Sequence, residues 1–229
     1  DSGQGLGTYY RSLTGGKLHL EGEGYRANLF GTCSSASQVV LEIPANGTSG
    51  PYALGNRFPK VNSERVEILV RDRNQPSVIL KSTAASRFSD YAVDYQTGGI
   101  LFRQPVPSLD ANLNPVSVRV TCEVGGGGPA AWIYGGDARF RVAPGVTVGG
   151  TYAREEQADD PYQLWSAHLG VDLAADTHFT AEVAGTRRQS LGSGQANRLE
   201  LVHEGGAVQA RAFVGRTDPN FDNPTSILA

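Results

Sequence analysis

The feature that most constrains the fold is a regular alternation of apolar and polar residues that begins after Pro129. Six segments of about ten residues show it, and this period is typical of β-strands with two unlike sides. In the first segment Trp132 and Phe140 fall on one side of an extended chain, whereas Arg139 and Arg141 fall on the other. A helical period would mix these residues, so the stretch predicts six antiparallel strands.

The connections between these segments alternate in length. Residues 143–145, 174–176 and 204–206 read as tight turns, whereas 155–161, 189–197 and the tail from 217 read as longer polar loops. Short turns at one end of a sheet and long loops at the other are typical of transmembrane β-barrels.

The two sides of the predicted strands differ in chemistry, and a barrel would give each side a different solvent. Charged side chains are costly in a dry core unless they are paired, but they suit a wet lumen. We therefore expect these residues to face a lumen: Arg139, Arg141, His168, Glu182, Glu200 and Arg211. We expect these to face lipid: Trp132, Phe140, Trp165, Leu169, Val171, Phe179 and Val183.

The chain before Pro129 divides into two parts. Residues 1–37 predict a hairpin whose strands, Thr8–Leu13 and Lys17–Phe30, turn at Gly15-Gly16, because paired glycines supply the positive φ angles of tight turns. Residues 38–124 predict an inserted small β-sandwich, since short β-branched segments alternate there with Pro, Asn and Ser clusters. A glycine run at 125–128 predicts a flexible joint before the six-strand meander of 129–229.

Composition excludes several classes of function. The chain carries 20 Lys and Arg against 23 Asp and Glu with no basic stripe, which argues against nucleic-acid binding. No apolar run approaches the length of a membrane-spanning helix and no signal peptide is recognisable, so we expect a mature or excised exported chain.

The two cysteines stand at the two ends of the middle part of the chain. A bond between Cys33 and Cys122 would close a loop of roughly 90 residues, which stabilises by about 4 to 5 kcal/mol in the chain-entropy model. Two buried free thiols are the alternative. Neither cysteine has a CxxC partner, so a metal or redox cluster is not expected.

Other candidate sites have simple structural interpretations beside the functional ones. Asp110–Asn114 spaces oxygen ligands as a calcium loop does, but Pro115 replaces the required Gly, so an Asx turn is expected. Asp90 and Asp94 could act as an acid and base on a glycan, although Asp94 opens a turn sequence. Tyr52, Tyr91 and Tyr95 form either a platform for a sugar or core packing.

Catalytic motifs are not recognisable. The histidines lack metal-ligand spacing, the serines at 34, 35 and 37 lie outside a GxSxG setting, and Arg71–Asn74 is expected to be a solvated hairpin tip. No enzyme, cofactor or metal is therefore expected.

Several segments resemble parts of large, mostly uncharacterised bacterial outer-membrane β-barrel proteins that contain an inserted β-sandwich-like segment. The strand segments that carry the resemblance are Tyr152–Glu155, Pro161–Trp165 and Thr180–Ala184. The segments of the middle part that carry it are Ile43–Tyr52, Asn62–Val66, Asp90–Gly98 and Asn114–Val116. The resemblance implies a location in the outer membrane, with lipid as a partner, and no particular activity.

These observations predict an all-β chain with an antiparallel up-and-down membrane barrel of about eight strands, complete or part of a larger barrel, and an inserted β-sandwich. Its expected function is that of a non-enzymatic envelope anchor or pore, with a protein or glycan partner at the inserted part as an open possibility. The alternative is a soluble secreted β-sandwich protein that binds polysaccharide or a protein partner. Detergent dependence distinguishes the two.

Overall fold

The computed structural model describes residues 5–55, 59–76, 78–125, 129–158, 160–206, 208–223 and 225–226. In these residues the chain is all-β and antiparallel, as the alternation predicts, with its strands in three sheets. None of the described segments is a helix long and apolar enough to cross a membrane. The glycine joint at 126–128, Ser77 of one predicted strand and the last three residues lie outside the described part.

The chain divides into two compact units. The first consists of Asp1–Tyr9, Thr14–Ser34 and Pro129–Ala229, and the second of Tyr10–Leu13 and Ser35–Gly128. The larger part of the second unit, Ser35–Gly128, thus lies between two strands of the first unit in the sequence. Residues 10–13 and 35–37, which were expected in the first hairpin, belong to the second unit instead.

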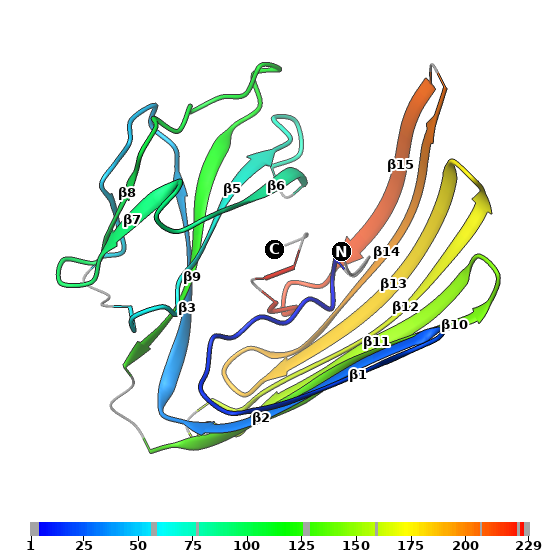
Figure 1. The fold of residues 1–229 in the computed structure, drawn as a ribbon, viewed down its shortest axis with the longest axis horizontal. Helices are drawn as coiled ribbons and strands as arrows, with labels where there is room; N and C mark the ends of the chain where they lie inside the picture. The colour runs from blue at the N-terminus through cyan, green and yellow to red at the C-terminus, as the bar shows by residue number, and fades with distance from the viewer. Residues whose placement is uncertain are drawn as a thin grey trace. The chain divides into compact units, whose positions relative to one another are not determined.

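The first unit contains one eight-stranded sheet, and its strands lie side by side in the order β1-β2-β10-β11-β12-β13-β14-β15 (Figure 1). In the described residues β1 and β15 are the two edges, each paired with one neighbour. The strands are β1 (Gly16–Gly22), β2 (Tyr25–Ser34), β10 (Ala131–Ala143), β11 (Val146–Glu155), β12 (Tyr162–Ala174), β13 (Thr177–Arg188), β14 (Gly192–Gly205) and β15 (Val208–Thr217).

The first hairpin differs from the prediction. Residues 8–13 form no strand, and β1 and β2 turn at Glu23-Gly24, where Gly24 has a φ of +82°. Gly16 lies inside the ladder, opposite Gly31. The turn therefore falls where one glycine supplies the left-handed backbone rather than where two glycines are adjacent.

The predicted loop at 189–197 is also wrong, because most of it is strand. β14 begins at Gly192 and pairs with β13 from Arg188 onward, so only residues 189–191 connect the two strands. The connection at 156–161 is the longer of those between β10 and β14. Gly145, with a φ of +72°, lies in the tight turn between β10 and β11.

The second unit contains two smaller sheets that share one core. The first sheet has the order β3-β9-β5-β6 and the second the order β4-β8-β7. Tyr52 and Phe102 from the second sheet meet Val66 and Val118 from the first sheet in a single buried cluster. The strands are β3 (Ala36–Pro44), β4 (Tyr52–Ala53), β5 (Arg65–Arg71), β6 (Ile79–Ala85), β7 (Tyr91–Asp94), β8 (Gly99–Phe102) and β9 (Val116–Gly125).

Candidate functional site: the two faces of the eight-stranded sheet

The strand register decides which side chains of the eight-stranded sheet share a face, because paired residues point the same way and neighbours along a strand point oppositely. Phe140, Val148, Leu169, Ala181 and Leu199 form one continuous row across five strands. All the residues expected to face lipid lie on the face that contains this row, which we call the apolar face: Trp132, Phe140, Trp165, Leu169, Val171, Phe179 and Val183.

The apolar face is exposed rather than covered. Trp132 is 58% exposed and Phe140 is 48% exposed, although each is a large apolar side chain. Exposed large apolar residues on this face come from all eight strands: Leu18, Leu20, Tyr25, Leu29, Trp132, Tyr134, Phe140, Tyr152, Trp165, Leu169, Val183, Leu199, Leu201, Val208 and Val214. A contiguous apolar patch of this extent marks a contact surface on a folded protein.

Aromatic residues on the apolar face gather toward the two ends of the strands. Tyr152 lies opposite Trp165 near one end of the sheet. Tyr25 lies opposite Phe140, and Phe179 opposite Val171, near the other end. In the row between them, β10 to β13 carry Ala138, Gly150, Ala167 and Val183.

All the residues expected to face a lumen lie on the opposite face, which we call the polar face: Arg139, Arg141, His168, Glu182, Glu200 and Arg211. Glu200 forms ion pairs with Arg198, at 2.9 Å, and with Arg211. His168 and Glu182 are directly opposite each other on β12 and β13, and both are buried.

Residues 5–9, of which Thr8 and Tyr9 were expected in a strand, cover part of the polar face. We call these residues the strap. The backbone N–H groups of Gly5 and Gly7 both donate to the Glu182 carboxylate, at 2.8 Å each. Hydrogen bonds to an ionised carboxylate are stronger than those between neutral groups, so they satisfy a buried charge that has little access to water.

The strap lies so close to the sheet that one of its residues cannot carry a side chain. A Cβ placed on Gly7 would lie 1.9 Å from Ser166 Oγ. Leu6, which is fully buried, packs against Ala184, Ala196 and Phe221. Gly5 and Gly7 were the only sequence signal for this close approach, and they resembled ordinary loop glycines.

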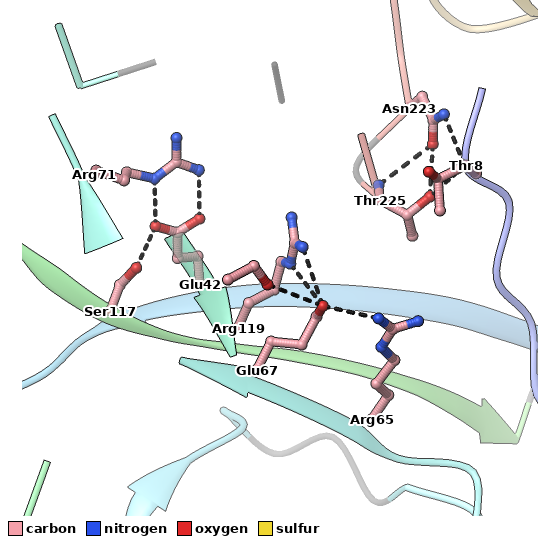
Figure 2. A network of polar contacts seen from close by, with 10 residues as sticks. Thr8, Glu42, Arg65, Glu67, Arg71, Ser117, Arg119, Asn223 and Thr225 are labelled. Carbon is pink, nitrogen blue, oxygen red and sulfur yellow. Dashed lines mark hydrogen bonds and ion pairs between the residues drawn. The ribbon is translucent and has the colours of Figure 1, made fainter. Parts of the chain in front are cut away.

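The C-terminal loop of the first unit holds the strap from its other side. The Asn223 side-chain amide donates to the carbonyl oxygens of Leu6 and Thr8, at 2.7 and 2.9 Å. The Thr225 hydroxyl donates to the Thr8 carbonyl at 2.7 Å (Figure 2). Further along the strap, Tyr9 stacks on Phe30 with ring centroids 5.5 Å apart. The Tyr9 hydroxyl donates to Glu155 at 2.9 Å.

The predicted disulfide is wrong, since no disulfide joins Cys33 and Cys122. Cys33 is exposed on the apolar face of β2, directly opposite Trp132. Cys122 lies in the buried cluster of the second unit, where it is 1% exposed. The alternation along β9 places its side chain among valines, and a buried thiol packs there as a small apolar group.

Charged side chains of the second unit form paired groups along one face of the β3-β9-β5 strands. Arg71 binds Glu42 through two hydrogen bonds of 2.7 Å, and Ser117 donates to the same carboxylate at 2.5 Å (Figure 2). Arg119 and Arg65 both pair with Glu67, at 3.0 and 2.9 Å. Arg71 was expected at a solvated hairpin tip but belongs to this ion-paired row.

The acidic candidates in the second unit serve turns. Asp110 Oδ1 accepts the backbone N–H groups of Asn112 and Asn114, at 2.8 Å each, which is the expected Asx turn. These backbone hydrogen bonds, the one from Asn114 first, lower the Asp110 pKa. Asp94 accepts the Gln96 N–H at 2.9 Å, and Asp90 accepts the Ser86 N–H at 2.7 Å.

The three tyrosines of the second unit do not form a shared exposed platform. Tyr52 and Tyr91 are each 3% exposed in the core, and burial raises the pKa of Tyr91 to about 12. The Tyr95 hydroxyl donates to Glu64 at 2.8 Å. No cluster of three or more His, Cys, Asp or Glu side chains suited to a metal occurs among the residues that the structure describes.

Comparison of the chain with protein-family models, with curated proteins and with solved structures found no match. The two faces of the eight-stranded sheet therefore offer the main indication of function.

Proposed function

We propose that the eight-stranded sheet crosses a bacterial outer membrane as part of an antiparallel β-barrel. In this proposal the apolar face meets lipid and the polar face meets the lumen. The second unit is then a β-sandwich carried between two barrel strands, and the whole is an envelope anchor or pore without enzymatic activity. The observation that carries the proposal is the exposure of large apolar side chains from all eight strands on a single face.

Water and lipid make opposite demands on such a face. In water, exposed apolar area costs roughly 25 cal/mol for each Å², so a contiguous face of this kind favours association or precipitation. In a bilayer the same side chains meet hydrocarbon, while the charged polar face is kept away from it. The lengths of β10 to β15, from 10 to 14 residues, also suit tilted strands that span a membrane.

The positions of the aromatic residues agree with this orientation. Tyr and Trp favour the two membrane interfaces, where their rings meet the headgroup region. Trp132 would lie toward one interface and Phe140, on the same face of β10, toward the other, about 26 Å away along the strand. The proposal also requires partners for β1 and β15, because an unpaired strand edge is not tolerated in hydrocarbon.

The strap favours an anchor over an open pore. It covers part of the polar face and is fixed by Glu182 and Asn223, so this part of the lumen would hold protein instead of water. An eight-stranded barrel has an interior that side chains alone nearly fill. A larger barrel, to which this sheet contributes only part of the wall, would leave room for a channel.

Tryptophan fluorescence tests the proposal directly, because both tryptophans of the chain, Trp132 and Trp165, lie on the apolar face. The full chain is folded into lipid vesicles, and its emission is quenched with lipids brominated at different acyl positions or with aqueous acrylamide. We expect strong quenching by the brominated lipids and weak quenching by acrylamide. Trp132→Phe and Trp165→Phe report each site separately.

Recovery of the chain in the aqueous fraction, with both tryptophans open to acrylamide, would refute the membrane location. That outcome would favour the soluble secreted protein with a polysaccharide or protein partner.

A further inference from the structure

Two arginines face each other on the polar face of the first unit. Arg26 on β2 is paired in register with Arg139 on β10, so their side chains project from directly opposite positions. The Cβ atoms of such a pair are separated by about 5 Å, and like charges at this spacing destabilise a sheet. The arrangement therefore needs a negative charge to offset it.

The carboxylates around this arginine pair do not supply that charge fully. Glu21 pairs with Arg26 at 3.4 Å, but both side chains are more than half exposed, and water screens such a pair. Asp137 accepts the Asn28 side-chain amide at 2.9 and 3.1 Å. Among the described residues no ion pair or hydrogen bond engages the Arg139 guanidinium.

The next positions along the same row add no carboxylate near Arg139. Gly149 follows Arg139 on β11 and carries no side chain, and the His168 ring occupies the space over it, since a Cβ on Gly149 would lie 2.3 Å from His168 Cε1. Glu182 is the next residue in the row, and its carboxylate already accepts the two N–H groups of the strap. Arg141, two residues from Arg139 on the same face, adds positive charge.

The sheet and the strap together line a cavity of about 240 Å³. Arg26, Arg139, Asn28 and Asp137 line it from the sheet, and Thr8 and Tyr9 line it from the strap. Its volume is below that of typical pockets for drug-sized ligands, so it suits a small solute.

We propose that this cavity is a binding site for a small oxyanion, such as sulfate or phosphate, held by the guanidinium groups of Arg26 and Arg139. Guanidinium groups bind oxyanions through paired, charge-assisted N–H donors. The Asp137 carboxylate also lines the cavity, and its negative charge lowers the affinity for an anion. The site depends on the first unit alone and does not require the opposite face to meet lipid.

The test measures anion binding to the full chain in detergent micelles, with inorganic sulfate as the probe and sodium chloride as the reference at equal ionic strength. We expect sulfate, and not chloride, to raise the unfolding temperature in a saturable manner, and calorimetry to report one site per chain. Arg139→Gln should weaken sulfate binding about tenfold, because one of two charge-assisted contacts is lost.

Two further variants keep the proposal falsifiable. Arg141→Gln removes an equal charge from the same strand and face but not from the cavity lining, so it removes no direct contact and should weaken binding less than Arg139→Gln does. Asp137→Asn should change binding in the opposite direction and tighten it, which remains measurable if Arg139→Gln does not fold.

Equal weakening by Arg139→Gln and Arg141→Gln, or no preference of the unmodified chain for sulfate over chloride, would overturn the proposal. Location is measured separately by lipid quenching, so a soluble chain that binds sulfate would refute the membrane proposal and leave the anion site intact.

Discussion

The two units differ in where their large apolar residues lie. The second unit buries them between its two sheets, whereas the first unit exposes many of them on one face of its sheet. In the second unit the two sheets enclose Tyr52, Ile100 and Val118, and water reaches almost none of their surface. In the first unit Trp132 and Phe140 are exposed on the apolar face, whereas Glu182 is buried on the opposite face, where it binds the strap. The second unit therefore covers its large apolar residues by itself, whereas the first unit leaves a broad apolar face exposed.

The same type of aliphatic residue should consequently contribute different amounts to stability in the two units. A buried aliphatic residue in the second unit contributes through burial that folding itself creates. An exposed aliphatic residue on the apolar face contributes little to stability in water, because folding does not bury it. It contributes only when an apolar medium covers it. The following experiments use this contrast, in order of expected effect.

Ile100→Ala should give the largest loss of stability. Ile100 is fully buried in the shared core of the second unit, so truncation removes burial and leaves a cavity, at a cost of about 2 to 5 kcal/mol. Hydrogen exchange of the β8 and β9 amides in the full chain measures the effect. Leu20→Ala on the apolar face, where Leu20 is 46% exposed, is the matched control, and in detergent it should cost well under half as much. Equal losses would remove the distinction between the units.

Leu169→Arg should prevent assembly in a bilayer. It places a charge on the apolar face near the middle of β12, and an Arg at the centre of a membrane costs roughly 2 to 4 kcal/mol. Thr180→Arg is the control, because Thr180 lies on the polar face of the neighbouring strand, opposite Glu200. Urea unfolding from vesicles and heat-modifiable gel mobility measure both variants. If the chain is soluble, Leu169→Arg should instead be harmless, since Leu169 is already partly exposed.

Glu182→Gln should loosen the strap without disrupting the sheet. The substitution weakens two charge-assisted hydrogen bonds to Gly5 and Gly7, at a cost of about 1 to 3 kcal/mol for the local contact. Faster hydrogen exchange at these two amides, with unchanged exchange in β13, is the expected result. Glu204→Gln is the control. It removes the same charge from an exposed position near the end of the neighbouring strand β14. Unchanged strap amides would show that Leu6 and Asn223 hold the strap without Glu182.

Glu42→Gln should reduce the acid sensitivity of the second unit. Burial raises the Glu42 pKa, but the hydrogen bonds from Arg71 and Ser117 outweigh burial, so the pKa is lowered overall. A carboxyl whose folded pKa is depressed stabilises the fold above its unfolded pKa, and this stability is lost as the pH falls through the folded value. We expect less than about 1 kcal/mol, because Glu42 and Arg71 are partly exposed. Unfolding curves between neutral pH and pH 3 measure it, and parallel curves for both proteins would contradict the assignment.

The contrast between the units also shows where sequence reasoning succeeded. Alternation with a period of two is a local property of the chain, and it predicted strands and the sharing of a face by Arg139, His168 and Glu182. It succeeded because a strand turns each successive side chain by half a revolution, whatever the strand pairs with. The hairpin turn was misplaced because Gly15-Gly16 and Gly24 both permit a positive φ, and only the pairing of Leu18 with Leu29 selects one of them.

Only the tertiary structure decided the features that join distant parts of the chain. The strap meets Glu182 across 175 residues of sequence, and no local pattern records that contact. The same is true of Arg26 and Arg139, which become neighbours because β2 pairs with β10 after the whole second unit has intervened. The cysteines bracket that second unit in sequence, yet the direction of each side chain left one on an exposed face and the other in a core. Local alternation determined which side of a strand each residue occupies, and long-range pairing determined what it meets there.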